Sequence, residues 1–268
     1  MSPMKILGIV NITEDSFSDG GKYLSADAAL AHARTLAKDA DILDLGAASS
    51  NPDAKAVAPD IEIARLASVV AALKESGVAI SVDTFATPVQ RWALAQNVDY
   101  LNDIQGFADE ALYPELAASR AKLIVMHSVQ GRGQATRINV PPAEILPRIH
   151  RFFEPRFAAL VEAGVARDRL ILDPGMGFFL GSDPQTSFTV LRALGDLKRA
   201  FGVPVLISVS RKSFLRALTG RGPEAAGPAS LTAELFAAHQ GADFIRTHDP
   251  KALRDGLAVW AVLDGNKL

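Results

Sequence analysis

The chain has 268 residues, 49% of them hydrophobic, so it is long enough to bury a large aliphatic core. Its 28 Lys and Arg residues nearly balance 30 Asp and Glu residues, which excludes the basic surface typical of nucleic-acid-binding proteins. The absence of cysteine excludes disulfides, thiolate catalysis and thiolate metal ligands. No apolar run reaches the roughly 18 residues of a membrane span, and the N-terminus lacks the features of a signal peptide. We therefore expect a cytoplasmic protein with neither nucleic acid nor membrane as a partner.

Eight short apolar runs recur along the chain and predict buried strands, at roughly 5–10, 41–45, 78–83, 97–101, 122–126, 169–173, 203–208 and 242–246. Segments with helical spacing separate them, among them 26–38, 62–74 and 143–163. Strands without strict alternation, separated by helices, are typical of a parallel sheet covered by helices. Eight such units predict an α/β fold, a (β/α)8 TIM barrel, as one domain over residues 1–268. An open doubly wound sheet is the alternative, but no G-x-G-x-x-G motif follows the first strand.

Polar side chains stand at the C-terminal end of every predicted strand. In chain order they are Asn11; Asp44, Ser49, Ser50 and Asn51; Asp83; Asn102 and Asp103; His127; Asp173; Ser210, Arg211 and Lys212; and Arg246 and His248. In a TIM barrel these ends converge on one face, which is where active sites of this fold lie. The sequence therefore predicts a site built from all eight strand ends.

Two carboxylates and an amide among these residues indicate the kind of molecule that the site binds. Asp83, Asp173 and Asn102 suit a planar heterocycle with adjacent N–H donors, because a carboxylate that accepts two N–H bonds from one edge gains geometric specificity. Any single aspartate is as often a helix cap or a turn residue. We interpret Asp44 and Asp103 mainly in that structural way.

The basic residues indicate an anionic group on the substrate. Arg246 and His248 stand two apart and face the same side if the strand continues through them. With Asn11 and the hydroxyls of Ser49 and Ser50, they are suited to hold a phosphate.

Other chemistries receive less support from the residues. We interpret His127 as a buried histidine with its hydrogen bonds satisfied. No metal-ligand motif is present, although Mg²⁺ bridged by substrate phosphates and one or two protein oxygens needs none. Lys212 at a strand end is also suited to form a Schiff base, as in barrel aldolases.

Six segments, in this order, resemble motifs of dihydropteroate synthases: GIVNITEDSFSDGG (8–21), SVDTF (81–85), YLNDIQG (100–106), LDPGMGF (172–178), VSRKSFL (209–215) and IRTHD (245–249). The resemblance spans essentially the whole chain and implies a TIM barrel. It also implies an enzyme of folate biosynthesis that joins 6-hydroxymethyl-7,8-dihydropterin diphosphate to p-aminobenzoate. The products would be 7,8-dihydropteroate and diphosphate.

The resemblance also assigns expected roles to individual residues. The pterin ring would be held by Asp83, Asn102, Asp173 and Lys212. The diphosphate would be held by Asn11, Ser49, Arg246 and His248, with Mg²⁺ at Asn11. The p-aminobenzoate side and its loops would be formed by Phe17, Ser50, Pro52, Phe178, Phe179, Lys212 and Ser213. Diphosphate would leave first in an SN1-like step, and the amine would then attack; of these residues, Asn11, Arg246, His248 and Lys212 would be the catalytic ones. Family members are commonly homodimers.

The chain departs from the usual family pattern in three loops. Glu14 replaces a usual proline, and Asn51 and Asp53 stand where an arginine and a glycine are expected. The loop at 175–187 is longer than usual and adds Phe179 and Leu180. These features resemble the sulfonamide-insensitive, Sul-type branch of the family. We expect the added aromatic bulk to exclude sulfonamides while the smaller p-aminobenzoate still enters; a neutral loop insertion is the alternative.

Three alternative functions remain at this point. A pterin-dependent methyltransferase shares the pterin-binding residues but has no need of the segment around Lys212 and Ser213. A phosphosugar aldolase would use Lys212 as a Schiff base. A non-catalytic pterin-binding relative is indicated only by the altered second loop.

Overall fold

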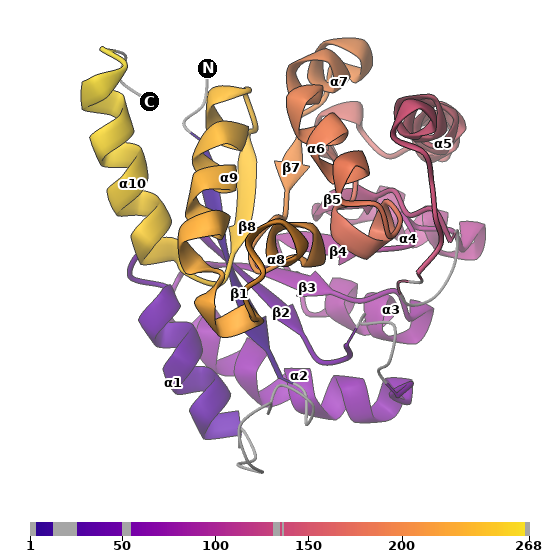
Figure 1. The fold of residues 1–268 in the computed structure, drawn as a ribbon. Helices are drawn as coiled ribbons and strands as arrows, with labels where there is room; N and C mark the ends of the chain where they lie inside the picture. The colour runs from indigo at the N-terminus through magenta and orange to yellow at the C-terminus, as the bar shows by residue number, and fades with distance from the viewer. Residues whose placement is uncertain (1–3, 13–25, 50–54, 131–134, 136, 266–268) are drawn as a thin grey trace.

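Eight parallel strands form the centre of the molecule, and the computed structural model describes residues 4–12, 26–49, 55–130, 135 and 137–265. The strands are β1 (Lys5–Asn11), β2 (Ile42–Gly46), β3 (Ala79–Asp83), β4 (Tyr100–Asp103), β5 (Lys122–Met126), β6 (Leu170–Asp173), β7 (Leu206–Ile207) and β8 (Phe244–Thr247). They pair in the order β6-β5-β4-β3-β2-β1-β8-β7, and a bridge between Leu172 and Val205 closes the ring. The predicted TIM barrel is thereby confirmed (Figure 1).

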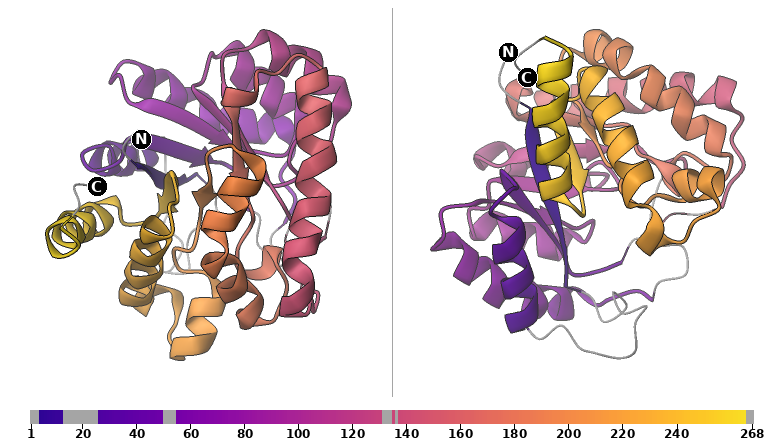
Figure 2. Two further views of the ribbon diagram at one scale, coloured as in Figure 1. Left: turned by 90° about the horizontal axis from the view of Figure 1, so that it is seen from above. Right: turned by 60° about the vertical axis from the view of Figure 1, so that its left-hand side comes forward.

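Helices surround this barrel on the outside, as both views in Figure 2 show. They are α1 (Ala26–Leu36), α2 (Pro59–Lys74), α3 (Thr87–Ala95), α4 (Tyr113–Ala118), α5 (Pro142–Glu162), α6 (Pro184–Arg192), α7 (Leu194–Phe201), α8 (Ser213–Thr219), α9 (Gly227–His239) and α10 (Pro250–Leu263). Single 3₁₀ turns lie at η2 (Glu110–Leu112), η3 (Arg167–Arg169), η4 (Gly177–Phe179) and η5 (Pro223–Ala225). Among the described residues, no helix is long and apolar enough to cross a membrane.

Two strands differ by more than two residues from their predicted bounds. The fourth, expected at 97–101, runs from Tyr100 to Asp103, because Asn97 adopts a left-handed conformation with φ 53° that ends the preceding helix. The seventh, expected at 203–208, contains only Leu206 and Ile207. Pro204 has no N–H to donate, and the N–H of Val205 bonds to a side chain instead of the sheet.

Near the N-terminal ends of the strands, the interior of the barrel is an apolar layer with one residue from each strand. These residues are Leu7, Ile42, Ala79, Tyr100, Ile124, Ile171, Leu206 and Phe244. Side chains alternate along an extended chain, so the residue two positions after each of these, in the strand or directly after it, also faces inward. That next layer consists of Ile9, Asp44, Ser81, Asn102, Met126, Asp173, Ser208 and Arg246. The barrel interior therefore changes from apolar to polar within one step toward the C-terminal ends of the strands.

Three aspartates directly before β2, β4 and β8 connect each of these strands to its neighbour. The carboxylates of Asp41, Asp99 and Asp243 accept the backbone N–H groups of Ile6, Ile80 and Val205 at 2.8, 2.8 and 2.9 Å. The backbone N–H of each aspartate donates to the carbonyl of the same partner residue. The three repeated contacts fix the register at the N-terminal end of the barrel, opposite the face where the strands end.

Replacing Asp99 by alanine is expected to lower the free energy of unfolding by about 1–3 kcal/mol, because the N–H of Ile80 loses its acceptor. Urea unfolding at 25 °C measures this loss. Asp255→Ala serves as the control, since Asp255 forms an exposed ion pair with Lys251 whose removal should cost at most about 1 kcal/mol. Equal losses in the two variants would show that the contact before β4 contributes nothing specific.

Candidate active site

An arginine and two carboxylates form the centre of the polar layer. Arg246 donates from Nε to Asp44 Oδ2 at 2.5 Å and from Nη2 to Asp83 Oδ2 at 2.7 Å. Asn102 Nδ2 donates to the same Asp44 oxygen at 3.2 Å. The side chain of Asp44 is 0% exposed and that of Arg246 is 14% exposed. Because little water competes in this position, these contacts hold strands β2, β3, β4 and β8 in one arrangement.

The interpretation of Asp44 as a cap or turn residue is wrong. The residue lies in the middle of β2, two positions after the inward-facing Ile42, and its carboxylate points into the barrel. The alternation of side chains along β2 is the signal that identifies it. Asp103 does have the expected structural role, since its carboxylate accepts the backbone N–H groups of Gln105 and Phe107 at 2.7 and 2.8 Å.

Burial changes the acidity of the carboxylates at this site. It raises the pKa of Asp83 to about 7, although the Arg246 guanidinium acts in the opposite direction and Asp44 adds to the increase. Burial also raises the pKa of Asp173 to about 6, against the hydrogen bond from the Gly175 N–H at 2.8 Å. Both carboxylates therefore change between proton donor and proton acceptor close to neutral pH.

Lys212 provides the second cation at the barrel mouth. It precedes α8 as its N-cap residue, and burial, followed by repulsion from Arg246, lowers its pKa to about 8. Asp173 and Asp83 counteract this decrease, so the ammonium lies within electrostatic range of both carboxylates of the predicted pterin set. The structure thus brings together Asp83, Asn102, Asp173, Lys212 and Arg246 as the sequence predicts.

One side of the mouth is apolar. Ile104, Met126, Ala135 and Phe179 form a buried cluster, with Phe85 and Phe178 packed against it. The ammonium of Lys212 lies 5.1 Å from the ring centroid of Phe179, within the range of a cation–π contact.

The loop after β6 packs closely on the start of α8. A Cβ added to Gly177, which has φ 66°, would come within 3.1 Å of Ser213 Oγ and 3.6 Å of Lys212 Cβ. Glycine is required here by both the conformation and the contact. This close approach places Phe178, Phe179, Lys212 and Ser213 along one wall of the barrel mouth.

Histidine residues follow β5 and β8. His127 is buried and its Nδ1 lies 3.1 Å from the carbonyl oxygen of Pro174, and burial lowers its pKa to about 4, as expected of a satisfied core histidine. His248 Nδ1 lies 2.9 Å from Ser210 Oγ. Burial, and then the cations Arg211, Arg246 and Lys212, lower the pKa of His248 to about 3. His248 is therefore neutral unless an anion binds beside it.

Asn11, at the end of β1, is exposed and lies near Asp83. A Cβ added to Gly46 would be 3.9 Å from both Asn11 Oδ1 and Asp83 Oδ2, so the two oxygens border the same space. No group of three or more His, Cys, Asp or Glu residues suited to a metal occurs within the described ranges. Mg²⁺ prefers oxygen ligands and commonly uses few protein groups together with substrate phosphates. Asn11 Oδ1 is an oxygen of this kind, whereas Asp83 Oδ2 already accepts from Arg246.

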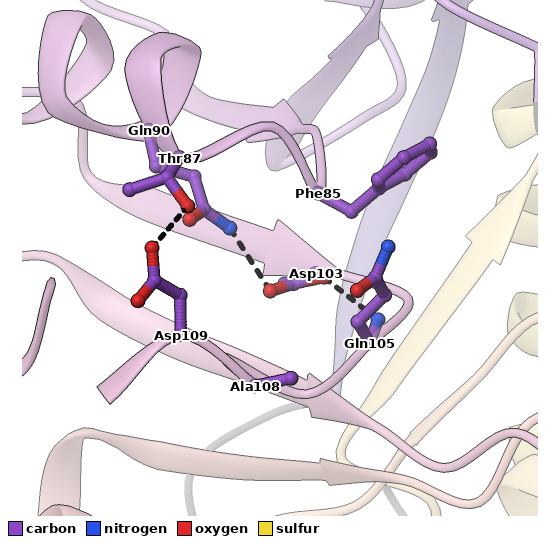
Figure 3. A pocket seen from close by; sticks show the side chains of 7 residues that line it. All are labelled: Phe85, Thr87, Gln90, Asp103, Gln105, Ala108 and Asp109. Carbon is purple, nitrogen blue, oxygen red and sulfur yellow. Dashed lines mark hydrogen bonds between the residues drawn. The ribbon is translucent and has the colours of Figure 1, made fainter. Parts of the chain in front are cut away.

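A second network ties together the loops that follow β3 and β4, and Figure 3 shows its centre. Gln90 Nε2 donates to the Thr84 carbonyl at 3.1 Å and to Asp103 Oδ2 at 2.9 Å. The Thr84 N–H in turn donates to the carbonyl of Asn102 at 2.9 Å. A cavity of about 280 Å³ opens beside Gln90 and Asp103. The role of Gln90 could not be predicted, because nothing in a helical segment marks one glutamine as buried.

Several predicted residues are not placed by this structure. Phe17, Ser50 and Pro52, assigned to the p-aminobenzoate side, lie outside the described residues, as do Glu14, Asn51 and Asp53. Ser49 is half-buried just after β2. Arg211 forms a 3.9 Å ion pair with Glu224.

Comparisons with known proteins agree with this geometry. The model of the family described as "Pterin binding enzyme" matches residues 7–248. Dihydropteroate synthase type-2 of Escherichia coli is 61% identical over 259 residues, which cover 96% of this chain and 95% of that protein. The structure of Xanthomonas albilineans dihydropteroate synthase with 4-aminobenzoic acid has a TM-score of 0.89 at 36% identity, covering 99% of this chain and 95% of the other. The same enzyme in complex with 7,8-dihydropteroate has a TM-score of 0.85 at 34% identity, with the same coverage.

The family match spans most of the barrel, and the relatives cover nearly their full length. The chain belongs to the dihydropteroate synthase family of pterin-binding enzymes.

Proposed function

We propose that this protein is a transferase that condenses 6-hydroxymethyl-7,8-dihydropterin diphosphate with p-aminobenzoate to give 7,8-dihydropteroate and diphosphate in folate biosynthesis. The observation that carries this proposal is the set of acceptors at the barrel mouth, the buried Asn102 and Asp173 and the partly buried Asp83, beside the two cations Lys212 and Arg246. Relatives that are 50–61% identical to this chain are named dihydropteroate synthases, and a solved relative binds 4-aminobenzoic acid.

The acceptors account for recognition of the pterin. Asn102 is 4% exposed, and its side-chain oxygen has no hydrogen-bond partner in the described part of the chain. A buried acceptor without a partner costs about 1–3 kcal/mol, which a bound N–H group would recover. In this proposal Asp83 and Asp173 accept the remaining N–H groups of the pterin edge, and Lys212 donates to a ring acceptor.

The reaction needs positioning and charge stabilisation more than a covalent nucleophile. The bond between the pterin methylene carbon and the diphosphate oxygen breaks, and its electron pair leaves with the diphosphate. The amine nitrogen of p-aminobenzoate then forms the new C–N bond and loses a proton. The leaving group would be held by Arg246, His248, Asn11 and Ser49. Loss of the diphosphate leaves a carbocation at the pterin methylene carbon, and the apolar wall with Phe179 would shield this carbocation from water.

Asn11 would hold Mg²⁺, which supplies positive charge against the departing diphosphate when bound. This role rests on the exposed position of Asn11 at the end of β1, beside the space that Gly46 leaves open at the barrel mouth. We also propose a cytoplasmic homodimer, as the family resemblance implies, and one catalytic barrel over the whole chain.

We further propose that the enzyme is insensitive to sulfonamides. Phe179 is 5% exposed, lies in the apolar wall and contacts the ammonium of Lys212. A side chain held in this way has little freedom to move aside for a substrate analogue that is bulkier than p-aminobenzoate.

Diphosphate release tests the proposed reaction. The purified full-length chain is mixed with the pterin diphosphate and p-aminobenzoate, and both diphosphate and dihydropteroate are measured. We expect one diphosphate per dihydropteroate, and no dihydropteroate when p-aminobenzoate is omitted. A chain that binds the pterin but releases no diphosphate would be a non-catalytic relative, and borohydride trapping of a substrate on Lys212 would support an aldolase instead.

Replacing Gln90 by methionine is expected to raise the KM for the pterin substrate about fivefold and to change the KM for p-aminobenzoate less than twofold. Methionine keeps the shape of the side chain but cannot tie Thr84 to Asp103, and these residues directly follow Asp83 and Asn102. Steady-state kinetics with each substrate varied separately measures the effect. Gln185→Met on exposed Gln185 is the control; equal effects on both KM values would contradict the proposed link.

A further inference from the structure

Arg211 has a backbone conformation that is rare for a residue with a side chain. The N–H of Lys212 donates to the carbonyl of Val209 at 3.1 Å, so residues 209–212 form a turn with Arg211 as its third residue. The φ of Arg211 is 58°. Glycine or asparagine is usual at a turn position with positive φ, because most other side chains crowd the backbone there. A contact from outside the turn is therefore needed to hold Arg211 in this conformation.

The turn connects two parts of the barrel mouth. Ser210, its second residue, accepts the backbone N–H of His248 at 3.2 Å, and its Oγ lies 2.9 Å from His248 Nδ1. Lys212, its last residue, has its ammonium within electrostatic range of both carboxylates of the predicted pterin set. Arg211 lies between these two residues. A change in the φ of Arg211 would therefore displace Ser210 and Lys212 relative to each other.

Ser230 supplies the contact from outside the turn. It lies on α9, which packs against α8 and β8 on the outside of the barrel (Figure 1). Ser230 is 5% exposed, and its Oγ accepts the N–H of Arg211 at 2.9 Å and donates to the carbonyl of Ala226 at 2.8 Å. The direction of both hydrogen bonds is fixed, because a backbone N–H can only donate and a carbonyl can only accept.

A second left-handed residue is held in the same way. Phe107 has a φ of 60°, and its N–H donates to the buried carboxylate of Asp103 at 2.8 Å. In both places a buried side-chain oxygen accepts the N–H of a residue whose own side chain disfavours the conformation. The hydrogen bond offsets the strain, since a change in φ would also turn the N–H away from its acceptor.

We propose that Ser230 is a positioning residue that, by accepting the N–H of Arg211, holds the turn at residues 209–212 in its left-handed conformation and so places Ser210 and Lys212 at the barrel mouth. Without the Ser230 hydroxyl the strain at Arg211 is no longer offset, and the turn relaxes. The effect on the reaction rests on the proposed function, in which Lys212 contacts the pterin and His248 the diphosphate. The conformation of the turn does not depend on it.

Lys212 reports on the position of the turn. Burial, and then repulsion from Arg246, lower the pKa of Lys212 to about 8, while Asp173 and Asp83 act in the opposite direction. A relaxed turn would move the ammonium toward water and away from these groups. The pKa of Lys212 should then rise toward its ordinary value.

The chain offers a matched control in Ser187 on α6. Ser187 is 1% exposed, and its Oγ accepts the N–H of Gly177 at 3.0 Å. Gly177 is also left-handed, with φ 66°. Because glycine adopts this conformation without strain, its loop should keep its position when the serine hydroxyl is lost. S187A therefore reproduces the loss of a buried acceptor without releasing a strained turn.

The first test is the pKa of Lys212 in the unliganded full-length protein, measured by ¹³C NMR with lysine labelled at Cε; K212M identifies the signal. We expect a higher pKa in S230A than in wild type, and an unchanged pKa in S187A. The Tm should fall by similar amounts in S230A and S187A, since each variant leaves a backbone N–H without its side-chain acceptor. A lower Tm with an unchanged pKa of Lys212 in S230A would show a purely structural role and overturn the proposal.

Two further variants keep the proposal testable if S230A does not fold. S230C fills nearly the same space, but a thiol is a weak acceptor, so the pKa of Lys212 should change in the same direction. R211G removes the side chain that makes the left-handed conformation costly. R211G/S230A should then have the same Lys212 pKa as R211G. An equal effect of S230A with arginine and with glycine at position 211 would contradict the proposed support of Arg211.

Kinetics follow the functional consequence. S230A should raise the KM for the pterin substrate about fivefold and change the KM for p-aminobenzoate less than twofold. In wild type, kcat/KM for the pterin substrate should fall as the pH rises through about 8, because Lys212 then loses the proton that it donates. This fall should move to higher pH in S230A and stay in place in S187A. Failure of wild type to form dihydropteroate would overturn the proposed function, and the NMR result would still decide the role of Ser230.

Discussion

Arg246→Met is expected to lower the free energy of unfolding by about 3–5 kcal/mol, because Asp44 and Asp83 lose the guanidinium that pairs with both. The buried carboxylate of Asp44 and the partly buried one of Asp83 then repel each other, and the pKa of Asp83, already raised to about 7, rises further. Turnover should fall by about 10²–10³-fold, as when one donor to a developing anion is removed. Urea unfolding and the dihydropteroate assay measure the two effects.

Two further variants separate charge from geometry at this position. Arg246→Lys keeps the positive charge but cannot donate to both carboxylates from one planar group, so we expect a partial loss of stability and activity. Arg254→Met removes an exposed arginine paired with Asp41 at 3.3 Å and should cost at most about 1 kcal/mol. An Arg246→Met protein as stable as Arg254→Met would show that the buried pair contributes little to the fold.

Phe179→Ala is expected to increase the affinity for a sulfonamide by about tenfold or more, with the KM for p-aminobenzoate changed less than threefold. The reason is steric. The buried ring narrows the space beside Lys212 and Ser213, and alanine opens that space without moving the backbone. Inhibition of the dihydropteroate assay by sulfamethoxazole measures the change. Deletion of Phe179 should act in the same direction, because it shortens the loop at 175–187 toward the usual family length.

Phe178→Ala is the matched control for this prediction. Phe178 is the neighbouring ring, is half-buried, and lies under the guanidinium of Arg137 at 5.7 Å rather than under Lys212. Sulfonamide affinity in Phe178→Ala should stay within about threefold of wild type. If Phe179→Ala and the deletion both remain insensitive, the aromatic bulk at this position is not the cause, and the loop is a neutral insertion.

Most of the candidate site follows from two regularities of the sequence. Strand ends in a TIM barrel converge, so the positions of Asp83, Asp173 and Arg246 at strand ends are enough to predict that they lie together. Alternation within the strands then separates the apolar layer at Ile42 and Phe244 from the polar layer above it. The same alternation, applied to each strand in turn, places Asp44 inside the barrel.

Residues on the helices and loops could not be predicted in this way. Gln90 and Glu234 stand in ordinary helical segments, and their burial depends on which strand each helix covers. The short β7 could not be bounded either, because the N–H of Val205 bonds to Asp243, which lies far along the chain. These contacts form only when segments distant in sequence are packed together.

By itself the sequence determined the barrel, the family and the chemical character of its mouth, because these depend on the spacing of apolar runs and on the polar residues that end them. Only the tertiary structure decided how those residues are connected. It joined Arg246 to Asp44 and Asp83, and it joined Gln90 to Asp103. The physical reason is that hydrogen bonds and burial depend on distances between side chains, which the order of residues along one strand does not specify.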